Sequence, residues 1–235
     1  MKYPNFNEEK KLWKKGYKYV VGLDEAGRGP LAGPVVAGAV IIKNLKSILN
    51  EPIFKKVKDS KMLSAEQREE IYNYFKKNSG IEWGIGIVSE KVIDKINILE
   101  ATKLAMEKAI KDLELSFPRK RESMVGLSKL WIPSQAGNDT MKVEYLLIDG
   151  NFKINSLILQ KSIAKADQKV FSCALASIFA KVTRDGIMQK EHKKYPKYGF
   201  NQHKGYGTDF HFKMLKKHGP CKIHRKSFYP MNIFA

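Results

Sequence analysis

Residues 19–42 have the sequence YVVGLDEAGRGPLAGPVVAGAVII. The apolar run at residues 19–23 predicts a buried strand, and the run from Val35 to Ile42 predicts a second strand. The glycines and prolines between these runs favour a loop that would join the two strands as a hairpin. Two carboxylates, Asp24 and Glu25, follow the first run directly. The stretch therefore predicts a sheet in which one strand ends at an acidic, glycine-rich loop.

The rest of the chain alternates between helix and strand patterns. Residues Ser64 to Gln67 form a capping box that opens one helix, and Asn97 caps another with an apolar face. Apolar residues from Leu175 to Val182 mark one face of a later helix. Residues 81–87 alternate in hydrophobicity and residues 143–148 are apolar, so we expect a strand in each. This alternation predicts an α/β fold with a basic helical C-terminus.

One segment has no clear period. The helix that begins at Asn97 is expected to end near Leu113, and the next strand starts at Val143. Connections between such elements normally take about 2–6 residues. We therefore interpret residues 115–141, which include Pro118 and Pro133, as an inserted surface loop. A functional lid is the alternative, and nothing in its residues favours it.

Composition excludes several classes of protein. The chain has 235 residues with 43 Lys and Arg against 24 Asp and Glu, which is a formal charge of +19. This length suggests one domain, or one domain with a small appendage. With only Cys173 and Cys221, the chain is not a secreted disulfide scaffold. No apolar stretch is long enough for a membrane helix, and the N-terminus lacks a signal peptide pattern. We expect a cytoplasmic, monomeric protein with a polyanionic partner.

The positive charge is concentrated near the C-terminus. Residues 190–226 hold eleven Lys and Arg but only two acids, together with all five histidines and six aromatic residues. A basic surface with interleaved rings suits neutralisation of a nucleic-acid backbone and stacking on sugars or bases. A lysine-rich surface over a small helical core is the alternative.

The adjacent carboxylates Asp24 and Glu25 suggest a metal site. Two neighbouring carboxylates repel each other unless a cation neutralises them, and hard divalent ions such as Mg²⁺ prefer oxygen ligands. Neighbouring side chains of a regular strand point to opposite faces, so both can converge only if the strand ends at this point. An exposed acidic turn is the alternative.

Further carboxylates strengthen the metal interpretation. Asp149 ends the apolar strand at residues 143–148, and sites form beyond the carboxyl ends of strands in α/β sheets. Asp167 precedes the helix marked by Leu175 to Val182. Asp185 lies toward the border of that helix's apolar face, where a salt bridge with Arg184 or Lys181 is favoured over a supporting role in the site.

Other kinds of site fit poorly. The glycines from Gly27 to Gly33 have neither the dinucleotide-binding spacing nor the ending of a phosphate-binding loop. Cys221 and His224 could hold a structural zinc with His218, but paired ligand spacing is missing. No arrangement indicates a serine or cysteine nucleophile.

The motifs of the chain resemble, in order, those of the ribonuclease HII family. They are VGLDEAGRGPLAGPV at 21–35, DSK at 59–61, NILEAT at 97–102, IDGN at 148–151, KAD at 165–167, ASIFAKVTRD at 176–185, HKGYGT at 203–208 and HRKSF at 224–228. The similarity covers nearly everything from Tyr19 to Phe228 except the expected insertion. It implies a ribonuclease H-like fold, in which a central mixed five-stranded sheet is flanked by helices. It also implies a catalytic domain over residues 1–189 and a C-terminal helical extension over 190–235 that binds substrate.

The resemblance implies an endonuclease that cuts the RNA strand of RNA–DNA hybrids, including single ribonucleotides embedded in duplex DNA. The metal and catalytic carboxylates would be Asp24, Glu25, Asp149 and Asp167, holding Mn²⁺ or Mg²⁺. Substrate contacts would come from Gly27, Arg28, Gly29, Lys61 and Tyr206. The glycine-rich segment would read the ribose 2′-hydroxyl, largely through its backbone, and Tyr206 would stack on the following sugar.

The physical chemistry agrees with these implied roles. A single ribonucleotide is distinguished from DNA by its 2′-hydroxyl, and glycine lets a backbone approach that group closely. Hydrolysis of a phosphodiester without a protein nucleophile suits two metal ions held by carboxylates.

Two departures from the family pattern matter. The expected insertion precedes the strand that carries Asp149, and Ala174 stands where a hydroxyl side chain is usual, beside Ser172 and Cys173. The second departure affects local hydrogen bonding but no implied metal ligand. A non-catalytic basic nucleic-acid-binding protein derived from the same fold is therefore the alternative function.

Overall fold

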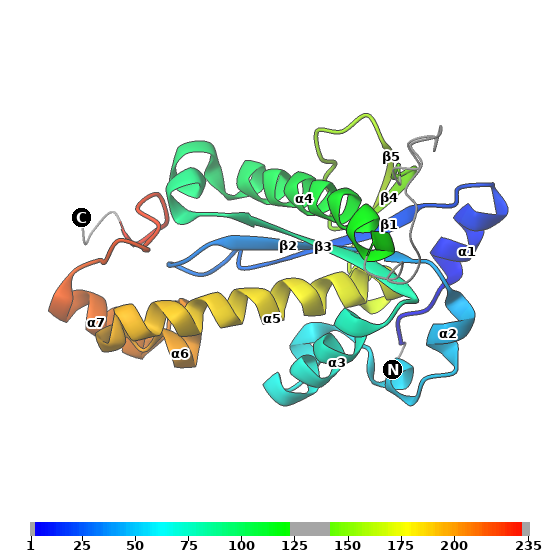
Figure 1. The fold of residues 1–235 in the computed structure, drawn as a ribbon. Helices are drawn as coiled ribbons and strands as arrows, with labels where there is room; N and C mark the ends of the chain where they lie inside the picture. Colours follow the sequence, from blue (N-terminus) through cyan, green and yellow to red (C-terminus); the bar gives the residue numbers. More distant parts are fainter. Residues whose placement is uncertain (1–2, 123–141, 232–235) are drawn as a thin grey trace.

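The computed structural model describes residues 3–122 and 142–231. Its centre is a five-stranded sheet in the order β3-β2-β1-β4-β5 (Figure 1). The strands are β1 (Val20–Ala26), β2 (Val35–Ile42), β3 (Ile81–Val88), β4 (Tyr145–Asp149) and β5 (Leu159–Ile163). The first three strands pair antiparallel, whereas β1–β4 and β4–β5 pair parallel. The sheet is therefore mixed and five-stranded, as expected.

Helices cover both faces of this sheet (Figure 1). One face carries α4 (Glu90–Glu122), and the other carries α5 (Phe171–Lys194) and α3 (Ala65–Lys77). The shorter helices are α1 (Asn7–Lys14), α2 (Leu45–Leu49), α6 (Phe200–His203) and α7 (Asp209–His218), with 3₁₀ turns at Pro52–Lys56, Ser60–Met62, Ala166–Gln168 and Pro196–Tyr198. The last two helices lie at the end of α5, which runs without a break across residues 189 and 190. The long helix thus ties the C-terminal extension to the sheet.

The predicted helix starts are present. The capping box at Ser64 forms, since its hydroxyl accepts from the Gln67 N–H and the Gln67 side chain accepts from the Ser64 N–H. The Asn97 side chain caps the following turn by accepting from the N–H groups of Leu99 and Glu100. Sequence reading missed the helical residues from Glu90 onward, because Asn97 has a left-handed φ of 65° inside α4 and marks a kink between two helical segments.

The end of α4 corrects one expectation. The helix continues to Glu122, so the prediction of an irregular loop beginning at residue 115 is wrong for the first part of that segment. Pro118 did not stop the helix. Residues 123–141 of the expected insertion lie outside the described residues.

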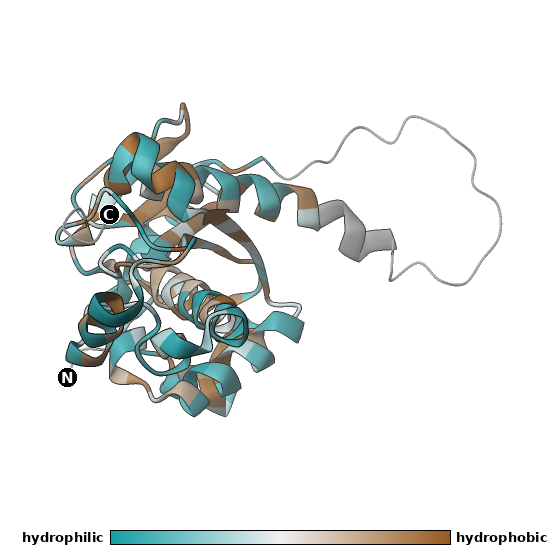
Figure 2. Cartoon of the chain, turned by 90° about the vertical axis from the view of Figure 1, so that its left-hand side faces the viewer, coloured by the Kyte–Doolittle hydropathy of each residue, from teal (hydrophilic) through white to brown (hydrophobic). Residues whose placement is uncertain are grey.

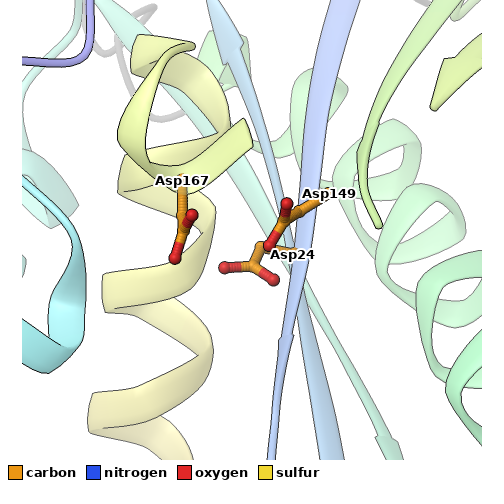
Figure 3. A group of neighbouring side chains, drawn as sticks. All are labelled: Asp24, Asp149 and Asp167. Carbon is orange, nitrogen blue, oxygen red and sulfur yellow. The ribbon is translucent and has the colours of Figure 1, made fainter. Parts of the chain in front are cut away.

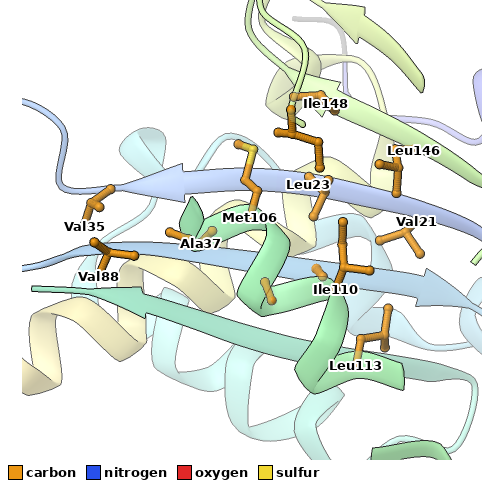
Figure 4. Packing of buried hydrophobic residues seen from close by; sticks show 14 of the residues in the cluster. Val21, Leu23, Val35, Ala37, Val88, Met106, Ile110, Leu113, Leu146 and Ile148 are labelled. Carbon is orange, nitrogen blue, oxygen red and sulfur yellow. The ribbon is translucent and has the colours of Figure 1, made fainter. Parts of the chain in front are cut away.

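The larger core lies between the sheet and α4. In Figure 4, Val21, Leu23 and Ala37 point from β1 and β2 toward Met106 and Ile110 of the helix, and all five are buried. Figure 2 shows hydrophobic residues on the strands and hydrophilic residues on the outward surfaces of the helices. This division is typical of an amphipathic α/β domain.

Both faces of β3 are covered. Its glycine face lies against α4, because a Cβ added at Gly86 would be 1.8 Å from the Ala105 carbonyl oxygen. The opposite face packs in a second core, where Ile81 is buried and Trp83 and Ile85 are half-buried, while Ile87 at the strand end is 43% exposed. On the glycine face, close approach of the α4 backbone replaces side-chain interdigitation.

A buried carboxyl group links α1 to the start of α5. Glu9 is fully buried, and its Oε1 atom accepts from the Ser172 N–H (2.9 Å) and hydroxyl (2.8 Å). Burial raises the pKa of Glu9, and its Oε2 atom has no hydrogen-bond partner among the described residues. Ala174, the departure from the family pattern, is buried among apolar residues. The altered stretch is therefore accommodated.

Removing this carboxyl group should destabilise the fold. Glu9→Ala leaves two buried Ser172 donors without an acceptor, which costs about 1–3 kcal/mol. Glu9→Gln keeps an acceptor oxygen and should be close to neutral. Urea denaturation of the two variants beside the wild type measures the difference, and equal midpoints for all three would contradict this role of Glu9.

Candidate active site

Three aspartates converge beyond the ends of the central parallel strands. Asp24 lies in β1, Asp149 ends β4, and Asp167 lies in the 3₁₀ turn that precedes α5. The first two stand side by side because β1 and β4 are parallel with Leu23 opposite Ile148. Figure 3 shows the three side chains pointing toward one another, and one ligand atom of each lies within 4.8 Å of the others.

Backbone hydrogen bonds fix two of these carboxylates. The Ala166 N–H donates to Asp149 Oδ1 at 2.6 Å, which ties the end of β4 to the turn that carries Asp167. The Glu25 N–H donates to Asp24 Oδ1 at 2.7 Å. Asp24 and Asp167 are 4% and 2% exposed, so few water molecules can screen their mutual repulsion. The folded chain therefore holds an electrostatically unfavourable cluster in place.

The pKa values of Asp24 and Asp167 reflect this unfavourable environment. Burial raises the pKa of Asp24 well above its usual value, and the charges of Glu25, Asp149 and Asp167 raise it further. Burial and the neighbouring Asp149 and Asp59 raise the pKa of Asp167 to about 6, although Lys61 opposes the shift. A divalent cation among these oxygens would remove the repulsion, and an all-oxygen donor set suits Mg²⁺ or Mn²⁺.

Glu25 lies beside this group and not within it. Because β1 continues through Ala26, the strand end that would let Asp24 and Glu25 converge is absent. Glu25 Oε1 accepts from Arg28 Nη1 at 3.2 Å, while its buried Oε2 atom has no partner among the described residues. Burial raises the pKa of Glu25, Arg28 lowers it, and Asp149 raises it, so its carboxylate lies within electrostatic reach of the cluster.

Lys61 lies at the edge of the cluster, with Nζ 3.7 Å from Asp167 Oδ2. Partial burial alone would lower the pKa of this lysine, but the charges of Asp167 and Asp59 raise it overall. Sequence reasoning gave Asp59 no role, although it opens the Asp59-Ser60-Lys61 motif. Its carboxylate accepts from the Lys61 N–H (2.9 Å) and from Gln168 Nε2 (3.1 Å), which joins two segments of the site.

The structure brings the glycine-rich loop and Tyr206 together. The Tyr206 side chain is 44% exposed and comes from the C-terminal extension. A Cβ added at Gly29 would meet only Tyr206 Cε1, at 3.8 Å. Arg28 is exposed, and its guanidinium lies 5.7 Å from the Phe152 ring centre. Gly29 therefore lies beside the exposed Tyr206 ring, shortly after the residues Asp24 and Glu25.

The structure bears on two alternatives that the sequence left open, the role of Asp185 and a structural zinc site. Asp185 pairs with Lys181 at 2.7 Å and with Arg68 at 3.8 Å, so its role is the expected salt bridge, although not with Arg184. The zinc arrangement of Cys221, His224 and His218 does not form. Within residues 3–122 and 142–231, the three aspartates are the one group with ligand atoms close enough to share a metal ion.

The histidines of the extension are instead structural. His211 Nε2 lies 3.0 Å from His224 Nε2, and both side chains are buried. Because His211 Nδ1 contacts the Tyr206 carbonyl and His224 Nδ1 accepts from the Cys221 N–H, both rings are satisfied in their neutral forms. Tyr198 and Phe200 belong to the same small core. Some of the aromatic residues in 190–226 therefore pack in a small helical core, whereas Tyr206 and Phe210 are exposed.

These neutral histidines predict an acid-sensitive fold. Burial lowers the pKa of both His211 and His224 to about 4, so the unfolded chain binds protons more readily below pH 6.5. Stability should fall as the pH drops from 7 to 5, by about 2 kcal/mol per histidine. His211→Gln should show a smaller drop and the exposed His218→Gln the wild-type drop in urea denaturation at the two pH values. Equal drops in all three proteins would contradict the assignment.

Comparisons with known proteins agree with this fold. Residues 21–231 match the family model described as Ribonuclease HII. A ribonuclease HII of Caldanaerobacter subterraneus subsp. tengcongensis is 43% identical over 94% of this chain and 78% of its own length. The structure of a ribonuclease H2 from Pyrococcus horikoshii is 26% identical, with a TM-score of 0.62 over 92% of this chain and 96% of that one. A Bst-RNase HIII structure in complex with Mn²⁺ shares the fold at 15% identity, with a TM-score of 0.65 over 92% of this chain and 68% of that one.

The mixed sheet and the cluster of aspartates define a metal-dependent ribonuclease with a ribonuclease H-like fold. The chain belongs to the ribonuclease HII family, and its activity is that of a ribonuclease on RNA–DNA hybrids. Among the described residues, no helix is both long and apolar enough to cross a membrane.

Proposed function

We propose that this protein is an endonuclease that cuts on the 5′ side of ribonucleotides, both in RNA–DNA hybrids and at single ribonucleotides embedded in duplex DNA. It would leave a 3′-hydroxyl and a 5′-phosphate and would use Mn²⁺ or Mg²⁺. The observation that carries the proposal is the adjacency of two features. Asp24 of the aspartate cluster directly precedes a glycine-rich loop, and the exposed Gly29 of this loop lies beside the exposed Tyr206 ring.

The residues of the cluster fit divalent cations. Three carboxylates converge, repulsion raises the pKa of the buried Asp24, and the buried Glu25 Oε2 atom lacks a partner. We assign Asp24, Asp149 and Asp167 as the converging ligands, with Glu25 completing the set from beside them. Two bound ions would activate the attacking water and stabilise the leaving 3′-oxygen. The chain itself supplies a rigid frame, because β1, β4 and the turn before α5 fix the carboxylates.

Recognition of the ribonucleotide would come from the loop and from Tyr206. The exposed backbone at Arg28 and Gly29, which follows the buried Gly27, can approach a 2′-hydroxyl more closely than a side chain would allow. The Tyr206 ring lies beside Gly29 and would stack on the next sugar. Lys61, beside Asp167, would meet a phosphate oxygen. Because the loop directly follows Asp24 and Glu25, recognition of the ribose would be coupled to cleavage.

The basic extension would hold the duplex. Exposed lysines, among them Lys213, Lys216 and Lys217, lie on α7, which is joined to α5 through the small core of the extension. Such lysines neutralise phosphates without reading sequence, so binding should weaken steeply as salt rises. We infer that the extension supplies affinity and that the loop supplies specificity. We also propose that the protein acts as a monomer in the cytoplasm.

A cleavage assay separates this function from that of a non-catalytic nucleic-acid-binding protein. With Mn²⁺ or Mg²⁺, the purified wild type should nick a duplex that carries one ribonucleotide, 5′ to that residue. Asp149→Asn should lose cleavage and retain most binding, because it removes a metal ligand and leaves the basic extension intact. A wild type that binds this duplex but leaves it uncut in both metals, across a range of pH, would establish the non-catalytic alternative.

A further inference from the structure

Two arginines are fully buried beneath the glycine-rich loop. Arg184 comes from α5, and Arg225 comes from the segment after α7. In the part of the chain that the structure describes, neither guanidinium has a carboxylate within ion-pair distance. Their side chains donate instead to backbone carbonyls, three hydrogen bonds from Arg184 and four from Arg225.

The two arginines hold different parts of the loop. Arg184 donates to the carbonyls of Ala32 (3.1 Å), Pro34 (3.0 Å) and Lys204 (3.0 Å), at the far end of the loop and in the extension. Arg225 reaches the carbonyls at the near end of the loop and also contacts Gly33 and Pro34. Both share the Pro34 carbonyl, so they form one buried unit.

Arg225 sets the direction of two peptide groups. Its Nη2 atom donates to the Gly27 carbonyl at 2.6 Å, and its Nη1 atom donates to the Arg28 carbonyl at 3.0 Å. A trans peptide is planar, so its C=O and N–H point in opposite directions. Holding these two carbonyls inward therefore aims the N–H groups of Arg28 and Gly29 outward. Among the described residues, neither N–H has a protein acceptor.

Two other N–H groups of the loop are already used. The Leu31 N–H donates to the Gly205 carbonyl and the Gly33 N–H donates to the Ile223 carbonyl, each at 2.8 Å. The free donors at Arg28 and Gly29 thus stand at the exposed end of an otherwise fixed loop. This end faces the space before Tyr206.

The chemistry of Arg225 suits a positioning role better than a stabilising one. Burial lowers the pKa of its guanidinium and so disfavours its charge, as does the nearby charge of Arg184. Buried charges without a counter-ion are costly, and an apolar side chain of similar volume would stabilise a fold more. A planar guanidinium, however, can hold two successive carbonyls in fixed directions, which a lysine cannot do.

We propose that Arg225 is a positioning residue for ribose specificity, because it orients the Arg28 and Gly29 N–H groups toward the 2′-oxygen of the substrate. This inference rests on the proposed function and adds a residue nearly two hundred positions away from the loop. The group that these two N–H donors would bind is a hydroxyl oxygen, which can accept two hydrogen bonds. A deoxyribose at the same position offers no such acceptor.

The test compares Arg225→Lys with Arg184→Lys as a matched control. Both variants exchange a fully buried arginine on the same loop, but only the first frees the Gly27 and Arg28 carbonyls. Binding is measured in an Asp149→Asn background for a duplex with one ribonucleotide and for the all-DNA duplex of the same sequence. Cleavage of the first duplex is measured in the active background, and thermal melting reports the fold.

The preference in binding is the readout that a merely structural role would not change. The wild type should prefer the ribonucleotide duplex by at least about tenfold. Arg225→Lys should lose this preference with an unchanged Kd for all-DNA duplex, and its kcat/KM should fall about 100-fold. Arg184→Lys should keep the preference, even with a similar loss of thermal stability.

Each other outcome counts against the inference. A folded Arg225→Lys variant that keeps the wild-type preference overturns it and leaves the proposed function intact. Loss of preference in both variants, or failure of Arg225→Lys to fold while Arg184→Lys folds, would show that Arg225 serves the fold in general. A wild type without any preference for the ribonucleotide would overturn the proposed function as well.

Discussion

Asp24→Asn is expected to abolish cleavage and to raise the thermal stability of the metal-free protein. Asp24 is a buried ligand of the cluster, and its charge is opposed by burial and by three neighbouring carboxylates. An asparagine keeps an oxygen that can accept from the Glu25 N–H but brings no charge. Loss of the charged ligand should lower kcat by at least about 10³-fold. Relief of repulsion should add about 1–2 kcal/mol.

The stability gain should depend on pH. Because the pKa of Asp24 is raised in the fold, the contribution of this one carboxyl group to stability falls as the pH rises above the ordinary aspartate value near 3.8. The advantage of Asp24→Asn should therefore be small at acidic pH and largest at neutral pH. Melting curves in a metal chelator across this range measure it.

A matched control lies on α4. Asp112 is exposed and accepts from the Ile85 N–H at 2.9 Å, a bond that asparagine can also make. Asp112→Asn should cleave like the wild type. Added Mn²⁺ should raise the melting temperature of the wild type and of this control more than that of Asp24→Asn, since only the last lacks a ligand. Cleavage by Asp24→Asn at the wild-type rate would remove Asp24 from the metal site.

Gly29→Ala should lose activity without losing stability. The added methyl group would meet only Tyr206, at an ordinary contact distance of 3.8 Å, and Gly29 has no left-handed backbone. The fold should tolerate it. The same methyl group would occupy the space through which a ribose reaches the Gly29 N–H. A displacement of the ribose by about 1 Å can cost about 100-fold in rate, so we expect a loss of that order.

Gly27→Ala is the matched comparison and should behave in the opposite way. Gly27 has a φ of 97°, and an added Cβ would lie 2.0 Å from Arg184 Nε. This variant should be destabilised by several kcal/mol, roughly the cost of strain and overpacking together. Melting curves and cleavage of the single-ribonucleotide duplex are measured for both variants. Wild-type activity in Gly29→Ala would place the substrate on another side of the loop.

Much of the fold could be predicted from local patterns. The strands β1, β2 and β4 are apolar runs bounded by turn residues, and the start of α3 follows from its capping box. Two elements escaped the residue patterns for physical reasons. The edge strand β5 is half exposed, so it lacks a clear alternation. The α4 helix escaped because the positive φ of Asn97 interrupts its early part and because Pro118, a usual helix breaker, lies inside it.

The sequence by itself determined that Asp24 and Asp149 each follow an apolar strand, and it determined the glycine-rich loop and the basic extension. Only the tertiary structure placed β1 beside β4, which brings these two aspartates together with Asp167. It also decided that Glu25 faces Arg28, because side-chain direction depends on where β1 ends. It alone revealed Arg225 beneath the loop. Such contacts join residues nearly two hundred positions apart, and no local pattern carries information over that separation.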